Sequence, residues 1–186
     1  IFIKQHLDRA ETNKIRLAKE FVKFNERCFV RLLGDMRSYN YVVNVVPDIE
    51  DYQYRIRAID FDQQSYEGRK NLYLPQFFKE NKKFVDLTLQ LLNKESIEQY
   101  QVEERTLIAF RLASSRYRVL DLLNIMAHDT ISSEEKRLQL QHELAEHFQN
   151  PNFNRLKTVG QVVKQTLRCA LKPHLSRIQR NLGKVF

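Results

Sequence analysis

The sequence has few of the residues that make tight turns or covalent cross-links. Its 186 residues include only four Gly, four Pro and two Cys, and no Trp. So few turn-forming residues favour a helix-rich chain. Cys28 and Cys169 lie far apart and have neither the spacing of a disulfide framework nor that of metal ligands. A disulfide-rich secreted fold is therefore excluded, and a reducing cytoplasm is the expected location.

Long hydrophobic runs and a secretion signal are absent as well. No run approaches the roughly 20 apolar residues of a membrane-spanning helix. The first residues, IFIKQHLDRAETNK, lack the apolar centre and the small-residue cleavage site of a signal peptide. The chain begins at Ile1 without an initiator Met, and we therefore expect it to be a piece of a longer protein.

Acidic residues are missing from the C-terminal tail, residues 151–186, which contains eight Lys or Arg. Those charges equal the net charge of +8, since residues 1–150 balance 23 basic against 23 acidic residues. Apolar residues recur in the tail at helical spacing, namely Val162, Val163, Leu167, Leu171 and Leu175. Three interpretations stay open: an amphipathic helix with a solvated basic face, a surface for an anionic partner such as nucleic acid or membrane, and a tail that folds over an acidic cleft.

The residues that are present are typical of a folded protein. With 42% hydrophobic and 29% charged residues, the chain is unlike a disordered one and long enough for a single domain with a core. The periodicity predicts an α+β fold that is mostly α. Its predicted parts are a leading helix (11–33), a β-hairpin region (34–68) with strands at 39–46 and 52–59, a helical body (69–150) and the basic helical tail (151–186).

Further helices are expected within the body and the tail. The helix over 102–128 is apolar around much of its circumference and is expected to be central. The helix over 132–148 opens with Ser132 and Glu135 in capping-box spacing. Two others are expected over 77–94 and from residue 159 to Pro173, which should end the last helix.

Two acid-bearing stretches flank the predicted hairpin. Asp35 follows Gly34, which we expect to supply flexibility, and Asn40 stands at the entrance to the first strand. Asp60 ends the second strand. Because an antiparallel hairpin brings the start of its first strand beside the end of its second, Asn40 and Asp60 should be neighbours. Their oxygens suit a hard cation such as Mg²⁺. Asp35 could accept a proton from an attacking hydroxyl, and Arg37 could balance phosphoryl charge.

The order D-x-x-x-x-N, hairpin, apolar-D-F resembles the catalytic and metal loops of protein-kinase-like phosphotransferases, most closely the aminoglycoside and choline kinase type. Here LGDMRSYNYVV and AIDFDQQSYEG occupy those places. The resemblance implies the C-terminal lobe of that fold, with ATP and Mg²⁺ as cofactors. It implies Asp35 as catalytic base, Asn40 and Asp60 as ligands of the Mg²⁺ that accompanies ATP, and Arg37 at the place of a phosphate-contacting Lys.

Two neighbouring residues have less specific roles. Asp62 is either a further metal ligand or a carboxylate that caps the loop. Phe61 is expected to anchor the loop in the core.

Residues 73–81, YLPQFFKEN, are expected either to shape an acceptor pocket or simply to pack. His142 and His147 are five residues apart, so they do not form a metal pair on one helix face and are expected at the surface.

The sequence departs from the kinase pattern in two ways. Leu33 stands where a His usually precedes the catalytic Asp. No G-x-G-x-x-G and no strand with its Lys precede the leading helix, so either a nucleotide-binding lobe lies upstream of Ile1 or the nucleotide site is incomplete. The leading hypothesis is ATP- and Mg²⁺-dependent phosphoryl transfer to an unidentified hydroxyl acceptor. The alternatives are a catalytically silent kinase-like interaction module and, more weakly, a basic helical nucleic-acid-binding domain.

Overall fold

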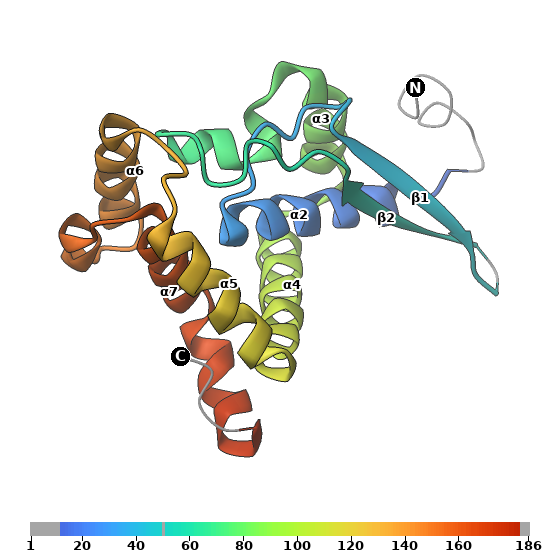
Figure 1. Ribbon diagram of the computed structural model, residues 1–186. Coiled ribbons are helices and arrows are strands. Elements are labelled where there is room, and N and C mark those ends of the chain that lie inside the picture. Colours follow the sequence, from blue (N-terminus) through green and yellow to red (C-terminus); the bar gives the residue numbers. More distant parts are fainter. Residues whose placement is uncertain (1–11, 50, 183–186) are drawn as a thin grey trace.

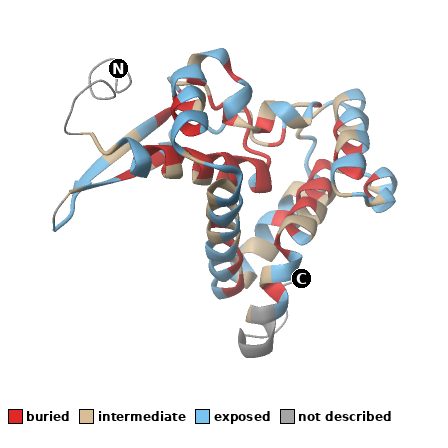
Figure 2. Cartoon of the chain, turned by 180° about the vertical axis from the view of Figure 1, so that it is seen from behind, coloured by how far each residue is buried: buried red, intermediate tan, exposed pale blue. Residues whose placement is uncertain are grey.

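The first helix of the chain that is described lies at the centre of the molecule. The computed structural model describes residues 12–49 and 51–182, so Glu11, the expected start of this helix, lies outside them. Helix α2 spans Lys14–Arg31; Asn13 caps its start by accepting a hydrogen bond from the Arg16 N–H. From Leu17 to Val30 nearly every residue of α2 is buried, on all sides of the helix. A helix that is buried all round has other elements packed on every face, as Figures 1 and 2 show.

The expected hairpin is present. Strands β1 (Tyr41–Pro47) and β2 (Tyr52–Ala58) form a two-stranded antiparallel sheet in which Tyr41 pairs with Ala58 and Pro47 with Tyr52. Tyr54 and Ile56 of β2 are buried, and β2 packs against α2 (Figure 1). The described part of the chain is therefore mostly helical with one small sheet, as the α+β prediction has it.

The helix expected over 77–94 is shorter than predicted. Three 3₁₀ turns, η1 (Lys70–Tyr73), η2 (Pro75–Phe77) and η3 (Lys79–Asn81), precede α3, which spans Lys82–Leu91. Pro75 holds the residue before it extended, and the buried Asn81 side chain donates to the carbonyls of Met36 and Pro75. These long-range bonds shape the segment, so its local helical pattern is overridden.

The long central helix expected over 102–128 is two helices. Helix α4 spans Lys94–Ser114 and α5 spans Arg116–His128, with the break at Ser115. The Ser114 hydroxyl donates to the Phe110 carbonyl, a bond by which Ser competes with the helix backbone. Leu123 is the buried residue of α5, and its other apolar residues are exposed or only partly buried. The expectation that this segment is central is wrong, because α2 occupies that position.

The last two helices also differ from expectation. Helix α6 spans Glu134–His147, and Ser133 caps its start by accepting a hydrogen bond from the Lys136 N–H. Ser132, the expected cap, instead donates its hydroxyl to the Tyr66 carbonyl. After the 3₁₀ turn η4 (Pro151–Arg155), helix α7 spans Val159–Leu182 and continues through Pro173. An interior proline costs about 3 kcal/mol. The buried side chains on both sides of it, Leu171 and Leu175, offset that cost by packing.

Two apolar clusters meet at α2. One joins the end of α2 to α4, α5, α6 and α7, and the other joins its beginning to the hairpin and α3. The five apolar residues singled out in the basic tail are all buried, so α7 is an amphipathic helix that packs on α4 and α5. The side chains of Arg177 and Arg180, and Lys184, lie outside the description. Among the described residues no helix is long and apolar enough to cross a membrane.

Candidate functional site

The two acid-bearing stretches lie side by side, joined by more than the hairpin. Helix α2 ends at Arg31 and is capped by Leu32, whose carbonyl accepts a hydrogen bond from the Ser65 N–H at 2.8 Å. Leu33 pairs with Gln64 in an antiparallel bridge, and the Gly34 N–H donates to the Gln63 carbonyl at 3.3 Å. The segment before Asp35 is thus tied to the segment after Asp62. This second pairing connects residues about thirty positions apart, and no local pattern in the sequence indicated it.

The backbone at this junction is held in an uncommon conformation. Leu32, Asp35 and Ser65 have φ values of 50°, 51° and 58°, in the left-handed region that side chains other than Gly rarely adopt. Such residues persist only where the surrounding structure imposes them, and they gather at functional sites. Asp35 is therefore presented from a constrained loop.

Gly34 is required for space, not for the flexibility expected from the sequence. A Cβ at this position would lie 2.9 Å from the Gln63 carbonyl oxygen and 3.4 Å from the Tyr73 ring. The glycine lets the two stretches approach closely enough to pair. The close approach is decided by tertiary structure, so the sequence could mark the glycine but not its reason.

Three of the predicted site residues come together. The Asp35 carboxylate accepts a hydrogen bond from Arg37 Nε at Oδ1 (2.8 Å) and one from Asn40 Nδ2 at Oδ2 (3.0 Å). The same Asn40 nitrogen donates to the Asp35 carbonyl at 2.7 Å. Asn40 is buried, whereas the Asp35 side chain is 32% exposed. The carboxylate is thus oriented by two donors and still reachable from solvent.

Arg37 connects this cluster to a third segment that sequence reasoning missed. Its Nη1 donates to Glu80 Oε1 at 2.9 Å, and its guanidinium lies over the Phe78 ring. The hydrogen bonds to Asp35 and then to Glu80 raise the pKa of Arg37 above its usual value. Glu80 is the only acid between Glu67 and Asp86, which was the one signal available in the sequence. It belongs to the 73–81 segment that was expected to pack or to shape an acceptor pocket.

Asp60 lies one residue beyond the partner of Asn40. The Ile59 N–H donates to the Asn40 carbonyl at 3.0 Å, which extends the ladder past the Tyr41–Ala58 pair. Asp60 Oδ1 accepts a bond from the Asp62 N–H at 3.2 Å, so Asp60 itself turns the loop. Asp62 is exposed, and no partner of its carboxylate is found in the described part of the chain. Phe61 is 53% exposed, so the expectation that it anchors the loop in the core is wrong.

The side-chain oxygens of Asn40 and Asp60 are too few to bind a metal ion alone, so they suit a cation whose other ligands are water and phosphate oxygens. No group of three or more His, Cys, Asp or Glu that could hold a metal exists among the described residues. Asn40 uses only its amide nitrogen on Asp35, which leaves its oxygen for a ligand, and Asp60 Oδ2 has no protein donor in the described structure. Mg²⁺ is commonly bound by one or two protein oxygens together with water and phosphate. Asn40 and Asp60 match that requirement in the kind of donor atom they offer, but no contact between their two side chains is found in the described part of the chain.

The position of β2 is set by a buried ion-pair network on α2 and α4. Glu20 Oε1 accepts the Ile56 N–H at 2.8 Å, and Arg27 Nη2 donates to the Ile56 carbonyl at 3.0 Å. Arg27 also pairs with Glu20 and, at 3.3 Å, with Glu104 of α4. Glu20, Arg27 and Glu104 are all buried. The strand that leads to Asp60 is therefore held by the helix that leads to Asp35.

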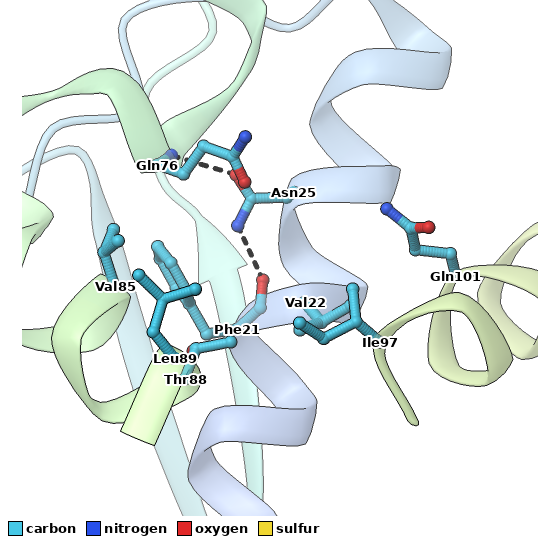
Figure 3. A pocket seen from close by; sticks show the side chains of 9 residues that line it. All are labelled: Phe21, Val22, Asn25, Gln76, Val85, Thr88, Leu89, Ile97 and Gln101. Atoms are coloured by element: carbon cyan, nitrogen blue, oxygen red, sulfur yellow. Dashed lines mark hydrogen bonds between the residues drawn. The ribbon is translucent and has the colours of Figure 1, made fainter. Parts of the chain in front are cut away.

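Two other features do not belong to the site. A cavity of about 90 Å³ lies between α2, α3 and the start of α4, and Phe21, Val85 and Leu89 supply part of its apolar lining (Figure 3). Asn25 crosses it to accept the Gln76 N–H at 2.9 Å. The cavity shares no lining residue with the acid loops. His142 and His147 are both exposed, as expected.

Comparison with protein-family models, with curated proteins and with solved structures finds no match to this chain. The chemistry of the site therefore has to be argued from its own residues.

Proposed function

We propose that the protein takes part in phosphoryl transfer from ATP to a hydroxyl acceptor, with Mg²⁺ as the accompanying cation. The observation that carries this proposal is the Asp35 carboxylate, held by Arg37 and Asn40 next to the loop of Asp60. An oriented carboxylate, a cationic side chain and two further oxygen ligands on one edge are the protein groups that such a reaction uses.

In this proposal each residue has one role. Asp35 accepts the proton of the acceptor hydroxyl as that oxygen attacks the γ-phosphorus. Arg37 offsets the negative charge of the phosphoryl group. Asn40 and Asp60 would hold Mg²⁺, which supplies charge neutralisation on the phosphate oxygens. The acceptor approaches over exposed side chains such as Ile59 and Phe61. A nucleotide-binding lobe outside this chain would cover the triphosphate, because the sequence contains no Gly-rich phosphate loop.

The first test is Asp35→Asn in the full-length protein. We expect phosphoryl transfer to fall by about 10²–10⁴-fold, the range that a general base contributes, while the far-UV CD spectrum and the unfolding midpoint stay close to those of the wild type. Asp86→Asn, an exposed acid of α3, is the matched control and should keep full activity. Transfer that is unchanged in Asp35→Asn would refute the assignment.

A catalytically silent interaction module is the second candidate. It is favoured by one observation, which is that both Asp35 oxygens already accept hydrogen bonds.

An anionic partner for the basic tail is compatible with either function, since Lys157, Arg168 and Lys172 are exposed on or beside α7. Binding to such a partner should weaken steeply as salt is added.

A further inference from the structure

Glu80 has one carboxylate oxygen that the observed structure leaves without a hydrogen-bond partner. Oε1 accepts the bond from Arg37 Nη1, whereas Oε2 is buried and has no partner among the described residues. The pKa of Glu80 lies below its usual value. The largest cause is the nearby backbone N–H of Glu80 itself, although this N–H makes no hydrogen bond of good geometry among the described residues. Burial acts in the opposite direction, and the bond from Arg37 lowers the pKa further. The carboxylate is therefore charged, and a charged oxygen without a donor is costly.

Asp35 has the opposite problem. A general base needs a carboxylate oxygen that can accept the substrate proton. Each Asp35 oxygen already accepts one hydrogen bond, Oδ1 from Arg37 and Oδ2 from Asn40, so the acceptor hydroxyl would have to share an oxygen with a donor. The buried Asn40 is also bonded to the Asp35 carbonyl and is not free to leave. Arg37 is the donor that can move, because its side chain is 36% exposed. Arg37 therefore donates to both residues: Glu80 still has one oxygen, Oε2, that lacks a donor among the described residues, whereas Asp35 Oδ1 has a donor at the place where the substrate hydroxyl would bind.

We propose that Glu80 is a positioning residue that draws Arg37 away from Asp35 and so frees Oδ1 for the acceptor hydroxyl. In the second arrangement Arg37 donates to both oxygens of Glu80, and its remaining N–H groups stay available to the phosphoryl oxygens. This arrangement fills the empty acceptor and is of the bidentate kind that Arg and carboxylate form most strongly. The inference rests on the proposed phosphoryl transfer and adds to it a residue from a third segment.

Glu80 is well placed for this role because its segment is fixed to the site loop. Asn81, the next residue, donates to the Met36 carbonyl at 2.8 Å and accepts the Tyr41 hydroxyl at 2.7 Å. Phe78, two residues before Glu80, lies beneath the Arg37 guanidinium. Arg37 already bonds to both carboxylates, through Nε to Asp35 and through Nη1 to Glu80, so the rearrangement needs only a turn of the Arg37 side chain.

The transfer step balances with Arg37 on Glu80. The acceptor oxygen forms a bond to the γ-phosphorus as the bond between that phosphorus and the bridging oxygen of ATP breaks. The electron pair of the broken bond stays with ADP. The hydroxyl proton passes to Asp35 Oδ1, which no longer accepts a bond from Arg37 Nε.

Glu80→Gln in the full-length protein tests the proposal. Gln keeps the length and one acceptor of the side chain but loses the charge and the second acceptor, so Arg37 should stay on Asp35. We expect kcat to fall on the order of tenfold, less than the roughly 10²–10⁴-fold contribution of a whole general base, with little change in the KM of the acceptor. Glu67→Gln, whose carboxylate pairs with Lys136, is the control and should be unaffected.

A double-mutant cycle separates positioning from a merely structural role. If Glu80 acts through Arg37, Glu80→Gln should cause no further loss of kcat in an Arg37→Ala background. A tenfold loss in both backgrounds, or none in the wild-type background, would overturn the proposal.

A spectroscopic measurement keeps this test independent of turnover. The Arg37 Nε–H signal in a ¹H–¹⁵N spectrum should shift and exchange more slowly with water in Glu80→Gln, because the N–H stays bonded to Asp35. An unchanged signal would overturn the role of Glu80. Absence of any transfer by the wild-type protein would instead refute the proposed function, and the Arg37 signal would still show whether Glu80 competes for Arg37.

Discussion

At the scale of single residues, the site depends on positions where an ordinary side chain or conformation does not fit. Leu32, Asp35 and Ser65 take up left-handed backbone angles, and Gly34 leaves room for the Gln63 carbonyl. Leu32, Gly34 and Ser65 lie within the pairing that joins the two acid stretches, and Asp35 follows it directly. Local strain of this kind is tolerated because the buried neighbours impose it.

Gly34→Ala tests the close approach. The new methyl group would lie 2.9 Å from a backbone oxygen, which cannot rotate away as a side chain could. We expect a loss of about 1–3 kcal/mol in the free energy of unfolding, the usual cost of overpacking, measured by urea titration. Ser38→Ala, in the same loop, should change the free energy of unfolding by less than about 0.5 kcal/mol. Equal stability of the two variants would contradict the packing argument.

At the scale of elements, a polar network and not only apolar contact holds β2 against α2. Arg27 is shared by Glu20, Glu104 and the Ile56 carbonyl, and Arg55 of β2 approaches Glu104 at 3.6 Å. Neither oxygen of Glu104 makes a hydrogen bond of good geometry with the described residues. Buried charges of this kind are a weak source of stability as a set, but removing one member leaves the others uncompensated.

Arg27→Met should therefore be strongly destabilising. We expect a loss of about 3–5 kcal/mol in the free energy of unfolding, because Glu20 and Glu104 stay buried after losing Arg27, the partner that they share. Adding Glu104→Leu should recover part of that loss. The Ile56 N–H, which Glu20 accepts, should exchange faster with solvent in the single variant. Lys94→Met, which removes the exposed pair with Glu98, is the control and should leave the midpoint unchanged. A similarly small effect of Arg27→Met would rule out the network as the support of β2.

At the scale of the whole molecule, the two apolar clusters share α2, so the site and the helical body are built on the same helix. Phe21 and Phe24 of α2 belong to the cluster under the hairpin, and Phe29 and Val30 belong to the cluster with α7. A ligand that binds only the folded site should therefore stabilise the whole chain against unfolding.

Thermal unfolding with Mg²⁺ and ATP distinguishes the two proposed functions. If the site binds nucleotide, the midpoint of the full-length protein should rise with ligand concentration, by an amount equivalent to about 2.7 kcal/mol at a hundredfold excess over Kd. Asn40→Ala and Asp60→Ala should reduce the part of the shift that depends on Mg²⁺. No shift at any concentration would favour the silent module over the phosphotransferase.

Local pattern was sufficient where the physical cause is local. The period of apolar residues marked α7, and the alternation in residues 52–58 marked β2, because each of these elements buries one face. The same period marked α2, although that helix is buried on all sides. The pairing of Asn40 with the end of β2 followed from hairpin geometry alone. Local pattern failed at Pro173 and in residues 77–81, where contacts from distant segments outweigh local preference. It also failed at Ser115, where the neighbouring Ser114 hydroxyl competes with the helix backbone.

By itself, the amino-acid sequence determined the mostly helical composition, the hairpin, and the presence of Asp35, Arg37 and Asn40 near one another, since these depend on near neighbours in the chain. Only the tertiary structure decided that α2 is the central helix, that Phe61 is exposed and that Gly34 leaves room for Gln63. It alone brought Glu80 to Arg37, across 43 positions. The reason is physical: a long-range contact depends on how separate elements pack, and no local period encodes that packing.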